Sequence, residues 1–183
     1  MRVRSFAGKR PVLGERAFVA STAVLVGDVE LGDDVNVWYG VVMRADIHHI
    51  RIGARTNIQD NVVIHVDAPD APTEVAEDVT VGHAALLHGC KVERGALIGM
   101  HATVLNRAVV GEEAMVAAHA LVPPGMCVPP RTLVAGVPAK VRRELEPAEI
   151  EHMRRGKQLY VELGARFLAE DDEREVDASG EEA

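Results

Sequence analysis

An aliphatic side chain recurs at every sixth position along most of the chain. The longest run is Val92, Ile98, Val104, Val110, Val116, Val122, Val128 and Val134. The same spacing occurs upstream at Leu13, Val19, Leu25, Leu31, Val37 and Met43, at Ile52, Ile58 and Ile64, and at Val75, Val81 and Leu87. A column of small residues lies two positions before the repeat, at Cys90, Ala96, Ala102, Ala108, Ala114 and Ala120.

This spacing indicates short strands and not helices. A helix of 3.6 residues per turn cannot keep every sixth side chain on one face, whereas a strand alternates its side chains with a period of two. Six residues then make one short strand and one corner, and three such units close a triangular coil with strands stacked about 4.8 Å apart. We therefore predict an all-β solenoid over residues 1–141. One longer interval, between Ile64 and Val75, predicts a loop that leaves a coil.

The pattern becomes helical near the C-terminus. Pro147 suits a first helical turn, and Ile150, Met153, Tyr160, Leu163 and Phe167 recur at helical spacing. We predict a helical segment over residues 142–170 that packs on the solenoid or on a neighbouring subunit. Residues 171–183 form an acidic tail, which is predicted to be disordered because like charges repel.

Charge and hydropathy exclude several classes of partner. The net charge is −8, but residues 170–183 carry eight acidic residues and one basic residue, so the remainder is close to neutral. No basic patch predicts nucleic-acid binding. No apolar stretch approaches the roughly 20 residues of a membrane span. We expect a cytoplasmic protein without nucleic-acid or membrane partners.

Three histidines have informative positions in the repeat. His65 follows Ile64 and His88 follows Leu87, three repeats apart, so both should point outward from the same face of adjacent coils. His83 lies on a different face, and it could join the other two only from an adjacent subunit of a three-fold oligomer. Three histidines with one open position are the ligand set of catalytic zinc.

Several motifs together resemble γ-class carbonic anhydrases over about residues 10–170. They are Arg44-Ala-Asp46, Ile50-Arg-Ile-Gly53, Asn57-Ile-Gln59-Asp60, His65, Gly82-His83, His88-Gly-Cys90 and Leu97-Ile-Gly-Met100. The resemblance implies a left-handed parallel β-helix of hexapeptide repeats with a C-terminal α-helix, assembled as a homotrimer. It implies a metal site at each interface, with His65 and His88 from one chain and His83 from the next. Zn²⁺ is the usual metal, and Fe²⁺ or Co²⁺ suits the same ligands.

The implied reaction is the reversible hydration of CO2 to bicarbonate by a metal-bound hydroxide. Gln59, expected to stack beside His65, would hydrogen-bond the bound water. Arg44, Asp46 and Asp60 match family positions near the site, and Tyr160 would reach it from the helix. The chain departs from the family in two respects: Ile-His-His follows Asp46, with no proton-shuttling glutamate, and the loop after His65 is short. Proton export would then depend on His48, Glu74 or buffer.

Two other functions fit a hexapeptide-repeat protein. An acyltransferase or thioesterase of this fold would use acyl-CoA in the cleft between subunits, with a histidine as general base. A non-catalytic metal-binding scaffold subunit would keep the metal site without either reaction. Gln59, Asp60 and the three histidines favour the carbonic anhydrase-like function, because acyl transfer does not need that combination.

Overall fold

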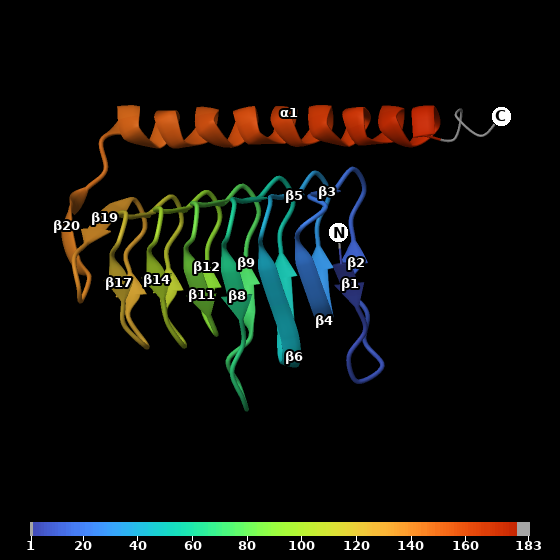
Figure 1. Ribbon diagram of the computed structural model, residues 1–183. Helices are drawn as coiled ribbons and strands as arrows, with labels where there is room; N and C mark the ends of the chain where they lie inside the picture. The colour runs from blue at the N-terminus through green and yellow to red at the C-terminus, as the bar shows by residue number, and fades with distance from the viewer. Residues whose placement is uncertain (1, 179–183) are drawn as a thin grey trace.

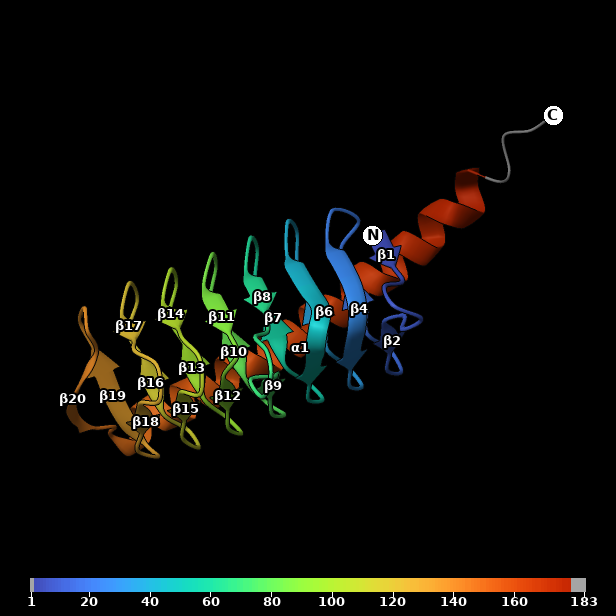
Figure 2. The same ribbon diagram turned by 90° about the horizontal axis from the view of Figure 1, so that it is seen from below.

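The computed structural model describes residues 2–178, and the side chains of residues 2–170. The chain coils into a solenoid of stacked parallel strands, and one long helix runs along its side (Figure 1). The two views agree that this helix spans all the coils (Figure 2). This arrangement confirms the predicted parallel solenoid with a C-terminal helix.

The strands lie on three faces of a triangular prism. The first face holds β1 (Arg2–Arg4), β4 (Val24–Leu31), β6 (Val42–Ile52), β8 (Val63–His65), β11 (Leu86–His88), β14 (Thr103–Val104) and β17 (Leu121–Val122). The second holds β2 (Val12–Leu13), β9 (Thr73–Val75), β12 (Lys91–Val92), β15 (Val109–Val110) and β18 (Cys127–Val128). The third holds β3 (Phe18–Val19), β5 (Asn36–Val37), β7 (Asn57–Ile58), β10 (Thr80–Val81), β13 (Leu97–Ile98), β16 (Met115–Val116), β19 (Thr132–Ala135) and the antiparallel β20 (Lys140–Glu144).

β4 and β6 are long because each bends around a corner and serves two faces. The start of β6 pairs with β8, and its end pairs with β9. Between these pairings, the register of β4 against β6 shifts at Gly27. Gly27 has φ +78°, and a Cβ atom there would lie 2.1 Å from the carbonyl oxygen of Ala45. Only glycine therefore fits this crossing of the two strands.

The repeat residues fill the interior as predicted. From Leu25 onward they are buried, and the small residues of the second column are buried beside them. Leu13 and Val19 differ, because they lie in the first coil; Leu13 is exposed and Val19 is only half-buried. Phe18 is buried in that coil instead, because the helix covers it. In the part of the chain that the structure describes, no helix has the length and apolar character that a membrane span needs.

The helix α1 (Pro147–Ala178) packs on its own solenoid. Trp38 makes edge contacts with Tyr160 and Phe167, with ring centroids 5.8 and 5.1 Å apart. Gly164 allows close approach, because a Cβ atom there would lie 2.9 Å from Cβ of Asn36. The helical backbone continues over residues 171–178, which the sequence analysis assigned to the tail. Residues 179–183 lie outside the described part of the chain, so the predicted disorder is not tested there.

A ladder of charged residues follows one corner of the prism, between its second and third faces. Successive coils place Arg16, Asp34, Arg55, Asp78, Gly95, Glu113 and Arg131 one above another through backbone hydrogen bonds. Basic and acidic residues alternate in this ladder, except at Gly95. Glu113 also binds Arg154 of α1 at 2.7 Å, so this carboxylate joins the solenoid to the helix.

The pKa of Glu113 predicts that the attachment of α1 depends on pH. Burial alone would raise the pKa of this carboxyl, but hydrogen bonds from Arg154 and Arg131 lower it overall. Its stabilising contribution is therefore present above the ordinary glutamate pKa of 4.5 and is lost as the pH falls through the lower native value.

We expect Glu113→Gln to lower the free energy of unfolding at pH 7 by about 1–3 kcal/mol, because the three hydrogen bonds that Arg131 and Arg154 donate to this group are no longer made to a charged acceptor. The melting temperatures of the variant and the original protein should converge as the pH falls from 7 to 3. Glu112→Gln is the control, since the side chain of Glu112 is 43% exposed and, among residues 2–170, pairs with Arg94 alone. A difference that stays constant over this pH range would contradict the assignment.

Candidate metal centre

His65 and His88 occupy matching positions on adjacent coils of the first face. β8 and β11 pair in register, so the two residues are direct neighbours. Their ring centroids are 5.0 Å apart, and Nδ1 of His65 lies 3.1 Å from Nε2 of His88. The prediction that these side chains stack is confirmed, and the structure adds that two ring nitrogens face each other.

The opposite nitrogen of each ring is held by an oxygen atom. Nε2 of His65 lies 3.0 Å from Oδ1 of Asp46, and Nδ1 of His88 lies 2.6 Å from Oδ1 of Asn106. Burial opposes ionisation of Asp46, but hydrogen bonds from His65 and Arg44 hold its pKa below the ordinary value. As a carboxylate, Asp46 only accepts hydrogen bonds. His65 therefore carries its proton on Nε2 when neutral.

Asn106 is a site residue that the sequence analysis missed. Its Nδ2 donates to the carboxylate of Asp67, in the loop after His65, so its Oδ1 is left to accept from His88. When both rings are neutral, the two nitrogens that face each other are then unprotonated. Two lone pairs 3.1 Å apart repel, and a cation between them removes this repulsion.

Thr73 connects the two histidine strands through the backbone. Its hydroxyl donates to the carbonyl oxygen of His65 at 2.5 Å and accepts from the backbone N–H of Gly89 at 2.9 Å. Thr73 is fully buried. It therefore fixes the start of the extruded loop against the strand that carries His88.

His83 lies after β10, on the corner that follows the third face, away from the other two histidines. Its Nδ1 lies 2.9 Å from Oδ2 of Asp60, one coil below, and its side chain is 43% exposed. Among the side chains of residues 2–170, no three from His, Cys, Asp or Glu of one chain form a group that could hold a metal ion. Because Asp60 holds Nδ1, Nε2 is the ring nitrogen of His83 that has no hydrogen-bond partner among residues 2–170.

Gln59 does not stack beside His65 as predicted. It lies on the third face, where its Oε1 accepts the backbone N–H of His83 at 3.1 Å. Its Nε2 donates to Oδ1 of Asn57 at 3.2 Å. The prediction failed because one repeat moves a residue to the next face and not to the next coil. Gln59 is therefore a partner of His83 within the chain.

Tyr160 lies on the His83 side of the molecule. It is half-buried against Trp38, and both burial and the negative charge of Asp60 raise the pKa of its phenol. The tyrosine therefore stays protonated at neutral pH and retains a donor.

Burial also raises the pKa of Cys90 to about 12, so this cysteine fills space in the small-residue column and carries no thiolate at neutral pH.

The histidines after Asp46 form a separate polar cluster. Nδ1 of His48 lies 3.2 Å from Nδ1 of His49, and Nε2 of His49 lies 3.2 Å from Oε1 of Glu74. Of the groups that the sequence analysis named for proton export, His48 and Glu74 are thus joined through His49.

Exposed apolar side chains flank both parts of the site. Val42 and Val63 point outward on the first face, two residues before Arg44 and His65 in their strands. On the His83 corner, Tyr39, Asp60, His83 and Met100 stack in one column. Tyr39 and Met100 are 41% and 53% exposed. The histidines and uncovered apolar surface therefore lie side by side on two separate parts of the chain.

Known proteins are similar to this chain in sequence and in fold. No model of a known protein family matches the chain. The chain is 43% identical over 164 residues to a carbonic anhydrase of Geobacillus kaustophilus, and the alignment covers 90% of each protein. It is 39% identical over 167 residues to the mitochondrial gamma carbonic anhydrase 2 of Arabidopsis thaliana, covering 88% of this chain and 60% of that protein.

A solved structure gives the same fold. A Bacillus cereus protein, provisionally named an acetyltransferase, superimposes with a TM-score of 0.89 at 38% identity, covering 91% of this chain and 96% of that one. The left-handed parallel β-helix expected from the sequence is thereby confirmed. High identity over nearly the full length of a carbonic anhydrase, together with this fold, shows that the chain belongs to the γ-class carbonic anhydrase family of hexapeptide-repeat proteins.

Proposed function

We propose that the protein is a carbonic anhydrase that hydrates CO2 reversibly at metal sites between the subunits of a homotrimer. His65 and His88 of one chain and His83 of the next would hold Zn²⁺, with Fe²⁺ or Co²⁺ as alternatives. The observation that carries the proposal is the pair of nitrogens, 3.1 Å apart, that face each other on His65 and His88.

The donor set fits such an ion. Two ligands at about 2.0–2.1 Å from a tetrahedral zinc ion lie about 3.3 Å from each other, close to the separation of the two histidine nitrogens. Metal-ligating histidines usually donate their second N–H to a carboxylate or another oxygen acceptor. All three histidines have such a partner, in Asp46, Asn106 and Asp60.

A trimer would bring the separated parts together. The exposed valines beside His65 and the exposed Tyr39 and Met100 beside His83 supply apolar surface for an interface. A head-to-tail contact between two different surfaces closes into a ring when the rotation is three-fold. Each interface would then contain one complete set of three histidines.

The bound metal would supply Lewis-acid activation of water at neutral pH. Arg44 orients Asp46, which in turn holds the ring of His65. Gln59 fixes the backbone of His83, and Asp60 fixes its ring. Tyr160 keeps its proton and can donate to an oxygen of the substrate. His48 and Glu74, which are joined through His49, would accept protons that leave the site.

Two measurements test the proposal together. The mass of the purified protein in solution should correspond to three chains, and metal analysis should give one ion per chain. Metal-loaded protein should accelerate CO2 hydration above the uncatalysed rate. A monomer without bound metal would contradict both the assembly and the reaction.

Asn106→Ala should weaken metal binding about 10–100-fold, the usual cost of removing an outer partner of a ligating histidine. The affinity is measured by competition with a chelator. Asn106→Asp is a second variant to compare. It keeps an acceptor for Nδ1 of His88, but its carboxylate would face that of Asp67. Thr132→Ala is the control, because it removes a side-chain hydrogen bond to the carbonyl oxygen of Pro129 in the last coil of the third face. Equal metal affinity in the protein and Asn106→Ala would exclude this role.

The likeness to a protein named an acetyltransferase favours acyl transfer as a second candidate. Titration with acetyl-CoA in a thermal-shift assay separates the two functions. Saturable stabilisation by acetyl-CoA, together with acyl transfer to an amine, would favour the transferase.

A further inference from the structure

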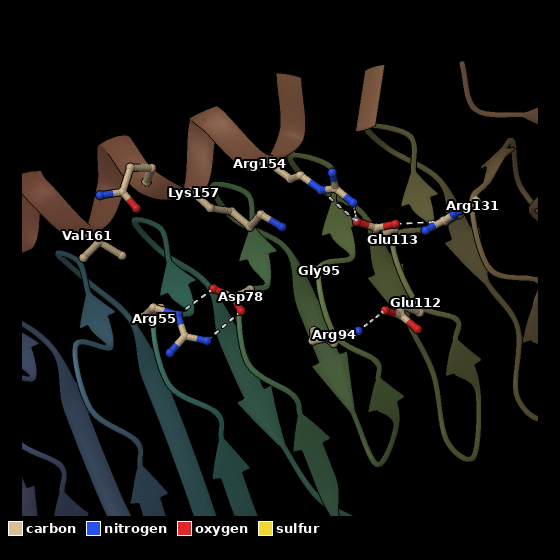
Figure 3. A pocket seen from close by; sticks show the side chains of 11 residues that line it. Arg55, Asp78, Arg94, Gly95, Glu112, Glu113, Arg131, Arg154, Lys157 and Val161 are labelled. Carbon is tan, nitrogen blue, oxygen red and sulfur yellow. Dashed lines mark hydrogen bonds and ion pairs between the residues drawn. The ribbon is translucent and has the colours of Figure 1, made fainter. Parts of the chain in front are cut away.

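The charge ladder on the corner has one gap, and a lysine of α1 lies over it. Gly95 stands between Asp78 and Glu113, where the alternation calls for a basic residue. Nζ of Lys157 lies 3.4 Å from the position that a Cβ atom of Gly95 would take. The helix thus delivers a cation to the place where the solenoid lacks a side chain (Figure 3).

Lys157 has no close partner for its charge. The residue is only 8% exposed, yet among residues 2–170 its amine makes no hydrogen bond or ion pair. Asp78 and Glu113 face it, but both carboxylates are bound by arginines: Arg55 holds Asp78 at 2.7 Å, and Arg154 holds Glu113 at 2.7 Å. Burial lowers the pKa of Lys157, and the two carboxylates oppose this effect. Binding an anion would offset the cost of burying this amine.

A cavity of about 340 Å³ lies between α1 and the corner, with the side chain of Lys157 directed into it (Figure 3). Five basic and three acidic side chains line it, so the wall carries two excess positive charges. The carboxylates of the wall are each bound to arginine, as at Arg94 and Glu112, 2.5 Å apart. The guanidinium groups keep further N–H donors, because each has five.

We propose that this cavity binds a small oxyanion of one or two negative charges, of the class of phosphate, sulfate and bicarbonate, through Lys157 and the neighbouring arginines. The excess of basic over acidic groups favours an anion over a cation. Hydrogen-bond donors on rigid corners and on α1 favour an oxyanion, which accepts several charge-assisted hydrogen bonds, over chloride. The site is separate from the histidines, so it depends neither on bound metal nor on the proposed reaction.

Inorganic phosphate is the probe that tests the site. Binding is measured by ³¹P NMR and by thermal shift. Phosphate is added in exchange for chloride, so that the ionic strength stays constant and a change in screening does not alter the result. We expect saturable binding to the full-length protein. Lys157→Met should weaken it at least about ten-fold, as expected when a charge-assisted interaction is lost. Lys140→Met, which removes an exposed lysine of β20, should leave the affinity unchanged.

Further arms separate this site from the metal centre and identify the anion. His83→Ala should retain phosphate binding, because His83 lies outside the cavity. Sulfate and bicarbonate, titrated as competitors, show which oxyanion the cavity prefers. Arg94→Gln is a second variant of the cavity wall, and it should also weaken phosphate binding. It tests the site if Lys157→Met does not fold. The proposal is overturned if phosphate shows no saturable binding, if the folded Lys157→Met and Arg94→Gln variants bind as the original protein does, or if only His83→Ala loses it.

Discussion

Replacing His83 by alanine is expected to lower both the metal affinity and the rate of CO2 hydration by more than about 100-fold. This loss exceeds the usual effect of removing an outer hydrogen-bond partner of a metal ligand. The reason is that His83 would be one of the three protein ligands of the ion, so its loss would leave the metal with only two. Metal analysis and stopped-flow hydration assays measure the two effects. The fold should be unchanged, because the side chain of His83 is 43% exposed.

A mixture of two inactive variants tests whether the site is shared between chains. His83→Ala and His88→Ala should each be inactive alone. When the two are unfolded together and reassembled in equal amounts, about a quarter of the interfaces of a three-fold ring should combine an intact His83 with an intact His65 and His88. About a quarter of the original activity should therefore return.

The control is His119→Ala, which removes an exposed histidine that stacks on His101, with ring centroids 4.9 Å apart. It should retain metal and activity. A mixture that stays inactive, although each variant assembles to the same mass, would show that the three histidines do not meet across an interface.

The repeat and the histidine pair could be predicted from the sequence because a solenoid converts spacing directly into position. Every sixth residue points into the core, and three repeats return the chain to the same face in the next coil, so Ile64 and Leu87 place His65 beside His88. The same rule places His83 on another face. These inferences require only the strand period and the number of faces.

The details that the sequence could not give arise where the chain departs from the repeat. Asn106 approaches His88 because Asp67, in the extruded loop, orients its amide, and no periodic rule predicts the path of that loop. Leu13 fits the repeat but is exposed, because no earlier coil covers it. The assignment of Gln59 to the side of His65 confused a step between faces with a step between coils.

The crossing of β4 and β6 is such an irregular feature, and Gly27→Ala should damage stability and the metal site together. A methyl group at this position would overlap the carbonyl oxygen of Ala45 and would also strain a backbone with φ +78°. We expect a loss of about 3 kcal/mol in the free energy of unfolding, from overpacking and strain combined. The displaced residue, Ala45, lies between Arg44 and Asp46, so metal affinity should fall as well.

Gly125→Ala separates the two causes. Gly125 has a similar φ of +72°, but no atom lies within 4 Å of the position that its Cβ atom would take. This variant should show only the backbone strain, about 1 kcal/mol, and should bind metal normally. Denaturant unfolding at one fixed protein concentration gives both values, because the stability of an oligomer depends on concentration. If the two variants lost equal stability, the contact with Ala45 would contribute nothing; if Gly27→Ala kept full metal affinity, the crossing would not position Asp46.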